Sequence, residues 1–158
     1  MKKIVPILFM MVLVFILVSP EVFAAAVGTR TVTEDKIVVE GKHSKKIITI
    51  AWTGSVDDGS IPNTTLNANA VKGWYFLSGE TNPDTPAPTD DYDIVINDAD
   101  GVDLAGGRLM DRDTSNTELV SGMGAYGYPL VRGDLTVVFT NQIVHSAKGT
   151  LILTFVSE

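Results

Sequence analysis

Alternation of apolar and polar residues is the clearest pattern along this chain. In residues 47–53, Ile48, Ile50 and Trp52 fall on one face of an extended strand, and threonines fall on the other. The same alternation recurs in residues 92–96, 135–140 and 150–156. Such alternation is typical of a sheet that buries one of its faces. We therefore expect four strands here, and we expect the last two to form an antiparallel pair.

Other segments indicate additional strands between polar or proline-rich connections. Residues 29–40 are rich in β-branched residues, which predicts one or two strands around a turn at Glu34-Asp35. Residues 71–78 predict a strand with aromatic residues on both faces, and residues 118–120 predict a weak strand. We expect connections at residues 41–46, 54–70, 79–89 and 122–129. The third of these connections contains three prolines, which exclude a helix or a central strand there.

Together these segments predict about seven to nine short strands and no convincing helix. Short strands with frequent turns favour a sandwich or barrel. We predict an all-β fold, an antiparallel β-sandwich of immunoglobulin-like or jelly-roll-like form. The length of 158 residues suits one such domain, which we place at residues 25–158.

The N-terminal residues have the pattern of a signal peptide. Lys2 and Lys3 precede an uninterrupted apolar run of residues 7–18, and small residues follow at Ala24-Ala25-Ala26. The run is shorter than the roughly 20 apolar residues of a spanning helix. We expect residues 1–24 to be a signal peptide. The alternative is an uncleaved membrane anchor, with membrane contact only through residues 4–18.

The composition of the chain excludes or disfavours several classes of function. The net charge is −7, from 12 basic and 19 acidic residues. A nucleic-acid partner is therefore disfavoured, because phosphate neutralisation requires a basic surface. The chain has no cysteine, which excludes disulfides, thiolate metal sites and a cysteine nucleophile. Apolar residues make up 45% of the chain, enough for a packed core.

The densest group of carboxylates lies in residues 90–103. Asp98, Asp100 and Asp103 are the candidate ligands for Ca²⁺, a cation that prefers several oxygen ligands. The pattern does not match a complete EF-hand loop, because Ile96 and Gly107 stand where ligands are required. The alternative is a solvated hairpin in which Asp100-Gly101 supplies the positive φ that the turn needs. We expect no other cofactor.

Two further groups are candidate sites. Tyr126 and Tyr128, in a glycine-rich loop, could stack on a sugar or contact a partner. His43 and His145 lie in polar connections, without a Gly-x-Ser-x-Gly elbow or a zinc-binding spacing. Paired carboxylates for glycoside hydrolysis are defined by spatial position and stay open. The sequence thus predicts no catalytic residues, and we expect the protein not to be an enzyme.

One longer string resembles a known group of proteins. It comprises residues 92–104, Gly106-Gly107, residues 111–114 and Asn116, and the similarity continues into residues 135–141 and 150–155. The string resembles a family of small uncharacterised proteins from phage and prophage structural genes. This resemblance implies a virion-associated β domain without an active site.

These observations predict a non-enzymatic structural or interaction protein, associated with a virion or other particle. We expect it to act as a homo-oligomer or by binding other structural proteins, through edge strands such as residues 29–33 or 150–156. The alternative is an exported β-sandwich module that binds carbohydrate or Ca²⁺. We expect an exported location, periplasmic or extracellular, or a place in the virion, and a membrane anchor if the signal is not cleaved.

Overall fold

The computed structural model describes residues 27–40, 43–124 and 127–157. Its elements, in chain order, are β1 (Thr29–Glu40), β2 (His43–Thr53), β3 (Thr64–Leu66), α2 (Ala68–Val71), β4 (Tyr75–Pro83), β5 (Asp93–Asn97), β6 (Glu118–Ser121), β7 (Leu135–Thr140) and β8 (Lys148–Val156). The predicted division into residues 1–24 and 25–158 falls outside the described residues and stays a prediction. Over the described ranges, no helix is both long and apolar enough to span a membrane.

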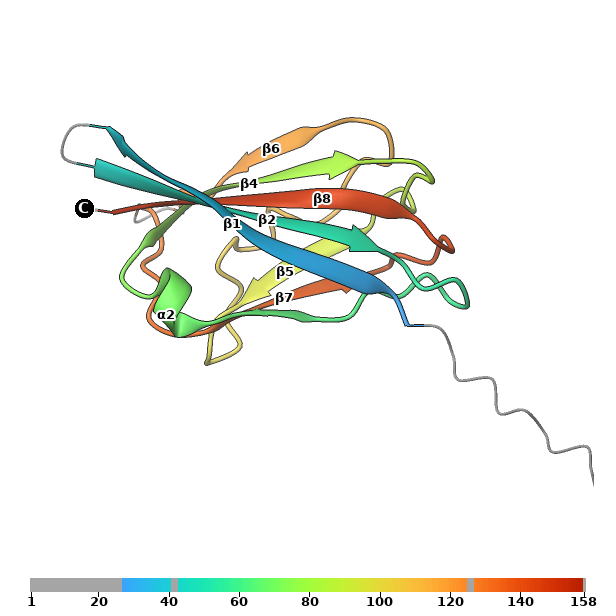
Figure 1. Ribbon diagram of the computed structural model, residues 1–158, viewed down its shortest axis with the longest axis horizontal. Helices are drawn as coiled ribbons and strands as arrows, with labels where there is room; N and C mark the ends of the chain where they lie inside the picture. Colours follow the sequence, from blue (N-terminus) through green and yellow to red (C-terminus); the bar gives the residue numbers. More distant parts are fainter. Residues whose placement is uncertain (1–26, 41–42, 125–126, 158) are drawn as a thin grey trace, which may run out of the picture.

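The strands form two sheets that pack face to face (Figure 1). One sheet has five strands in the order β1-β2-β8-β4-β6, and the other has three in the order β3-β7-β5. Every paired strand is antiparallel to its neighbour. The predicted all-β, antiparallel sandwich is therefore confirmed, and the eight strands fall within the predicted range.

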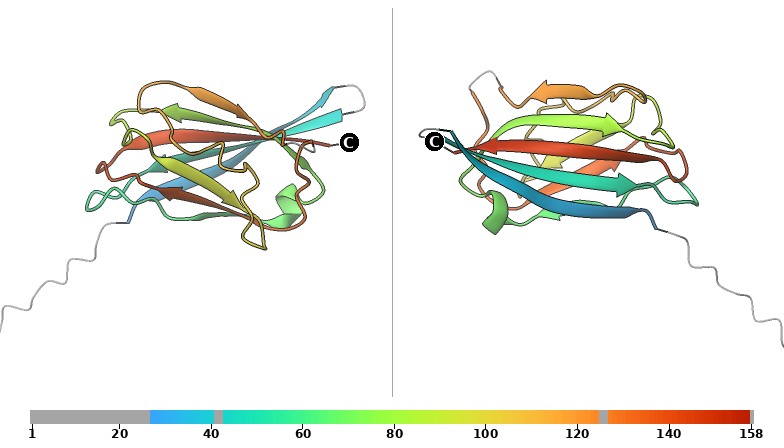
Figure 2. Two further views of the ribbon diagram at one scale, coloured as in Figure 1. Left: turned by 180° about the vertical axis from the view of Figure 1, so that it is seen from behind. Right: turned by 45° about the horizontal axis from the view of Figure 1, so that its top comes forward.

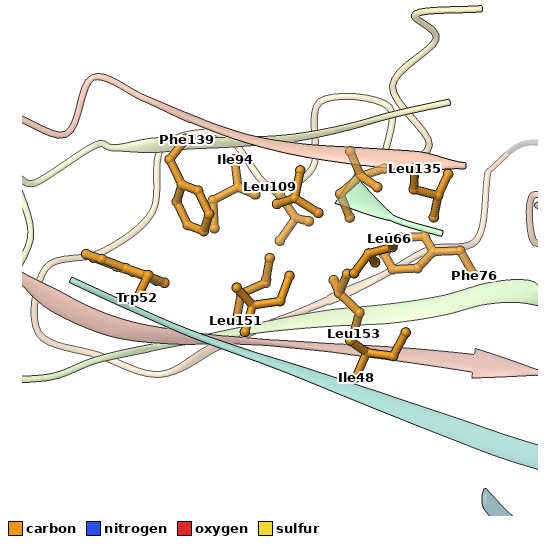
Figure 3. Close-up of a cluster of buried hydrophobic side chains, with 14 of the residues drawn as sticks. Ile48, Trp52, Leu66, Phe76, Ile94, Leu109, Leu135, Phe139, Leu151 and Leu153 are labelled. Carbon is orange, nitrogen blue, oxygen red and sulfur yellow. The ribbon is translucent and has the colours of Figure 1, made fainter. Parts of the chain in front are cut away.

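The core lies between the sheets and follows the alternation seen in the sequence. Ile48, Ile50 and Trp52 of β2 are at most 3% exposed, and each faces the three-stranded sheet. The buried residues of β7 and β8 come from opposite sheets: Leu135, Val137, Phe139, Leu151, Leu153 and Phe155. Figure 3 shows Leu135 and Phe139 of β7 across the core from Leu151 and Leu153 of β8. Burying this apolar surface is the main driving force for the fold.

The predicted pairing of residues 135–140 with residues 150–156 is wrong. β7 lies in the centre of the three-stranded sheet, between β3 and β5, whereas β8 lies between β2 and β4 in the other sheet. The connection between them crosses from one sheet to the other. Because both strands bury one face in the same core, their alternation is the same as that of a paired hairpin.

Strand boundaries also differ from the prediction at the N-terminal hairpin. The expected turn at Glu34-Asp35 is a register irregularity within β1, where Glu34 pairs with Ile48 and Lys36 with Ile47. β2 begins at His43, so most of the predicted turn at residues 41–46 is strand. Lys46 is 8% exposed; it donates a hydrogen bond to the backbone oxygen of Ala70, and its ammonium lies 5.0 Å from the Trp74 ring. These two contacts stabilise the lysine ammonium, while the aliphatic part of the side chain packs at the end of the core.

Two predicted connections contain structure that the sequence does not reveal. The segment 54–70 includes β3 and most of the short helix α2, whose N-cap Asn67 accepts a hydrogen bond from the amide of Asn69. β4 starts at Tyr75 and extends to Pro83, the first of the three prolines. Pro83 pairs with Gly149 beyond the end of β6, and so no ladder bond to β6 is lost there.

Tyr92 gives the core a pH-dependent component. It is 1% exposed, and burial raises its pKa to about 12. A tyrosine in the unfolded chain ionises near pH 10. The contribution of the neutral buried phenol is therefore complete below pH 10 and is lost as the pH rises through 12. Urea unfolding from pH 9 to pH 12 should show stability falling more steeply in the native protein than in Tyr92→Phe; equal slopes would contradict burial of a neutral phenol.

Candidate functional site

The turn after β5 is built by the first predicted carboxylate. Asp98 Oδ1 accepts hydrogen bonds from the amides of Asp100 (3.0 Å) and Val102 (2.9 Å). The Asp98 backbone oxygen accepts a third from the amide of Gly101, whose φ is +80°. Glycine adopts this conformation without a Cβ penalty, as expected for the Asp-Gly turn. The Asp98 carboxylate thus stabilises the turn itself.

The Asp103 carboxylate also accepts hydrogen bonds from neighbouring backbone amides. Its Oδ1 accepts from the amides of Ile96 and Ala105, both at 3.1 Å, and its Oδ2 accepts from the amide of Gly107 at 2.6 Å. Hydrogen bonds to an ionised acceptor are stronger than neutral ones. Asp103 therefore holds the segment after the turn against β5.

The structure places the three candidate calcium ligands on one turn without gathering their oxygens into an ion cage. Within the described residues, no group of three or more histidine, cysteine, aspartate or glutamate side chains has an arrangement that fits a metal ion. Asp100 is exposed, and the oxygens of Asp98 and Asp103 accept backbone amides. Calcium binding at Asp98, Asp100 and Asp103 stays a prediction.

The structure does bring the predicted calcium turn close to the predicted tyrosine loop. A cleft of about 520 Å³ lies beside the turn, and another of about 380 Å³ lies beside Tyr128, which is 38% exposed. Leu104 and Pro129 line both clefts. Arg132 lines the first cleft and Arg108 the second; neither arginine has a sequence signal that predicts its position. Tyr126 lies outside the described residues.

The sheet edges are the second feature of functional interest. The two sheets have β1, β6, β3 and β5 at their edges. The predicted edge strand at residues 29–33 is confirmed as part of β1. The other one, residues 150–156, is wrong, because β8 is flanked by β2 and β4. An edge strand exposes unpaired backbone groups that can pair with another chain.

The edge at β5 is covered by the chain's own following segment. The amide of Leu104 donates to the oxygen of Ile96 and the amide of Ile94 donates to the oxygen of Leu109, both at 2.8 Å. The Asp103 carboxylate accepts a further hydrogen bond, from the amide of Ile96. The backbone groups of β5 are therefore used within the molecule and offer little to a partner.

The remaining edges differ greatly in length. β3 has three residues and β6 has four, both shorter than a usual strand. β1 has 12 residues and contains neither proline nor glycine. Short edge strands are one of the devices by which proteins avoid unwanted pairing. β1 is thus the long, open edge among the described strands.

β1 is anchored at its start and exposed along its first half. A Cβ on Gly28 would lie 2.3 Å from the Ser60 oxygen and 2.8 Å from the Thr53 oxygen, and so only glycine fits this close approach. Beyond it, residues 29–33 are all exposed, and Val32 is 42% exposed. In Figures 1 and 2 the β1–β2 hairpin extends past the other strands, with β1 at the rim of the five-stranded sheet.

Charge is distributed unevenly between this hairpin and the rest of the chain. Residues 29–53 contain five basic and three acidic side chains, whereas residues 54–158 contain five basic and fifteen acidic ones. Like charge over most of the surface opposes the approach of two copies. The hairpin, with a net charge of +2, lacks the acidic excess of the rest of the chain.

Comparison with known proteins gives one likeness in structure. No family model matches the sequence, and no curated protein matches it. The fold is similar to a chain in the solved structure "Cyanophage Pam1 capsid asymmetric unit", with a TM-score of 0.41 and 16% identity, over 77% of this chain and 91% of that chain. At this level of likeness the function has to be inferred from the chain's own geometry.

Proposed function

We propose that this protein is a non-enzymatic structural module that joins a particle through the open edge of β1. The observation that carries the proposal is the contrast between β1 and the other edges: β5 is covered, β3 and β6 are short, and β1 is long, with residues 29–33 exposed. Main-chain pairing at such an edge gives affinity without a dedicated pocket.

The particle we propose is a phage virion, in line with the resemblance of residues 92–104 and the segments listed with them to small proteins from phage and prophage structural genes. The partner is a second copy of the chain or another structural protein. Pairing at one edge strand buries much less surface than the roughly 1,600 Å² of a typical stable interface. Many copies side by side on a particle would compensate, since multivalent attachment raises avidity without new contacts.

A charge at the centre of the exposed half of β1 should release the protein from particles. Val32→Lys is expected to move the protein from the particle fraction to the soluble fraction, because a lysine on an edge opposes strand pairing. Particle and soluble fractions from producing cells would be compared by quantitative immunoblotting. Val102→Lys is the matched control, since Val102 is 60% exposed on the turn after β5 and gains the same charge. Equal release by both variants, or by neither, would contradict the proposal.

The second candidate function is an exported module that binds Ca²⁺ or a sugar, and the clefts that share Leu104 and Pro129 favour it. If calcium binds the native state there, excess Ca²⁺ should raise the melting temperature above that in EDTA by mass action. Asp100→Ala should remove this rise, whereas Asp84→Ala, an exposed aspartate in another loop, should keep it. An unchanged melting temperature in the native protein would exclude the calcium form of this function.

A further inference from the structure

The first half of β1 is only partly covered on its inner side. Arg30 pairs with Trp52 and Val32 with Ile50, and these β2 residues are buried while Arg30 and Val32 are exposed. Residues directly opposite in an antiparallel pair point to the same face of the sheet. The three-stranded sheet therefore ends beneath β2, and β1 overhangs it.

We propose that this overhang is completed by a second copy of the chain, whose β1 pairs antiparallel with it about a two-fold axis at Val32. The inference rests on the proposed function and names its partner. The two five-stranded sheets would then form one continuous sheet. The two β1 strands would lie side by side at its centre, each pairing with the open edge of the other.

The sequence of β1 is self-complementary in this register. Residues 30–34 read Arg-Thr-Val-Thr-Glu. Pairing about residue 32 places residue 30, an arginine, opposite residue 34 of the partner, a glutamate, and places Val32 opposite Val32. Opposite charges and β-branched pairs directly across a sheet each stabilise the pairing. The result is an apolar centre flanked by complementary charges.

Neighbouring registers that keep both cores on the same side of the sheet lack this match. Such registers shift the axis by whole residues, to Thr31 or Thr33. An axis at Thr31 sets Arg30 opposite Val32, and an axis at Thr33 sets Val32 opposite Glu34 and would require pairing across the register irregularity that follows Glu34. The charges of residues 30 and 34 therefore favour the register centred on Val32 over its neighbours.

The second half of β1 has a similar order of charge but a different setting. Residues 36–40 read Lys-Ile-Val-Val-Glu, and the register irregularity between Glu34 and Lys36 separates them from the first half. A ladder crossing that irregularity would be interrupted. The first half begins at the anchored Gly28 and runs beside β2 residues that are fixed in the core. It is therefore the segment that we propose as the template for pairing.

Charge complementation at residue 32 tests the proposal. Val32→Lys alone and Val32→Glu alone should each self-associate at least about tenfold more weakly than the native protein, because like charges then stand opposite each other. An equimolar mixture of the two variants should restore association, because the introduced lysine of one copy then faces the introduced glutamate of the other. The measurement is sedimentation velocity over a concentration series of the protein as isolated from producing cells.

Val32→Thr serves as the control, since it keeps a β-branched side chain and should associate like the native protein. Association of each charged variant at native strength would overturn the proposal. So would two variants that fail to associate both alone and mixed, while circular dichroism shows them folded. In that case, release of Val32→Lys from particles in the fractionation test would still support β1 as the surface for a different partner, which separates the two proposals.

Discussion

Replacing Trp52 by alanine should lower the free energy of unfolding by about 3–5 kcal/mol, the range for large buried aromatic residues. Trp52 is 3% exposed and joins the two sheets: its ring centroid lies 5.5 Å from that of Phe139 on β7 and 5.9 Å from that of Tyr92. Removing it leaves a cavity that backbone hydrogen bonds on both sides prevent from closing. Chemical unfolding followed by circular dichroism measures this loss.

The neighbour of Trp52 provides a control for this prediction. A Cβ on Gly149 would lie 2.5 Å from Trp52 Cζ2 and 2.9 Å from Cε2, so Gly149→Ala alone should cost about 1–3 kcal/mol through overpacking. In the Trp52→Ala background the same change should cost much less, because the clashing ring is absent. Additive costs in the double variant would contradict the packing described here.

Replacing Asp103 by alanine should be the second most damaging change, with a loss of about 2–4 kcal/mol. Three backbone amides would lose a charged acceptor: those of Ile96, Ala105 and Gly107. Hydrogen bonds to charged groups are worth about 1.5–3 kcal/mol each, and they are not additive when they share one carboxylate. The loss is measured by urea unfolding at pH 7.

Two control variants, Asp103→Asn and Asp100→Ala, test this expectation. The asparagine keeps one acceptor oxygen in place and should lose less than the alanine. Asp100 is exposed on the same turn, and its replacement should change stability by no more than about 0.5 kcal/mol. If Asp103→Ala and Asp100→Ala were equally stable, the segment after β5 would be held in place without the carboxylate. Because Asp103 also covers the β5 edge, its loss should increase aggregation on long storage.

The strands could be predicted because their signal is local. Alternation of Ile48, Ile50 and Trp52 arises from the two-residue period of a strand, and β7 has the bounds that the sequence predicts. Pairing could not be predicted in the same way. β7 and β8 show the same alternation whether they pair with each other or lie in opposite sheets, since either arrangement buries one face.

The features that matter for function depend on which strands are neighbours. The sequence correctly indicates an edge in residues 29–33 but does not separate it from β8, since edge position is set by the order of strands in the folded sheet. The acidic turn is recognisable as a hairpin with Asp-Gly, yet its spacing does not reveal that Asp103 binds backbone amides of β5. Lys46 falls in a predicted polar turn because its burial depends on Ala70 and Trp74, both distant in sequence.

The central claim is that the open edge of β1 is the surface through which the protein associates. Amide hydrogen exchange, read by mass spectrometry on the dilute and the associated protein, tests it most directly, because paired amides exchange slowly. We expect new protection in the associated state at residues 29–34, with little change in β5 or β8. Association that leaves β1 unprotected, or that protects the clefts around Leu104 and Pro129 instead, would contradict the claim.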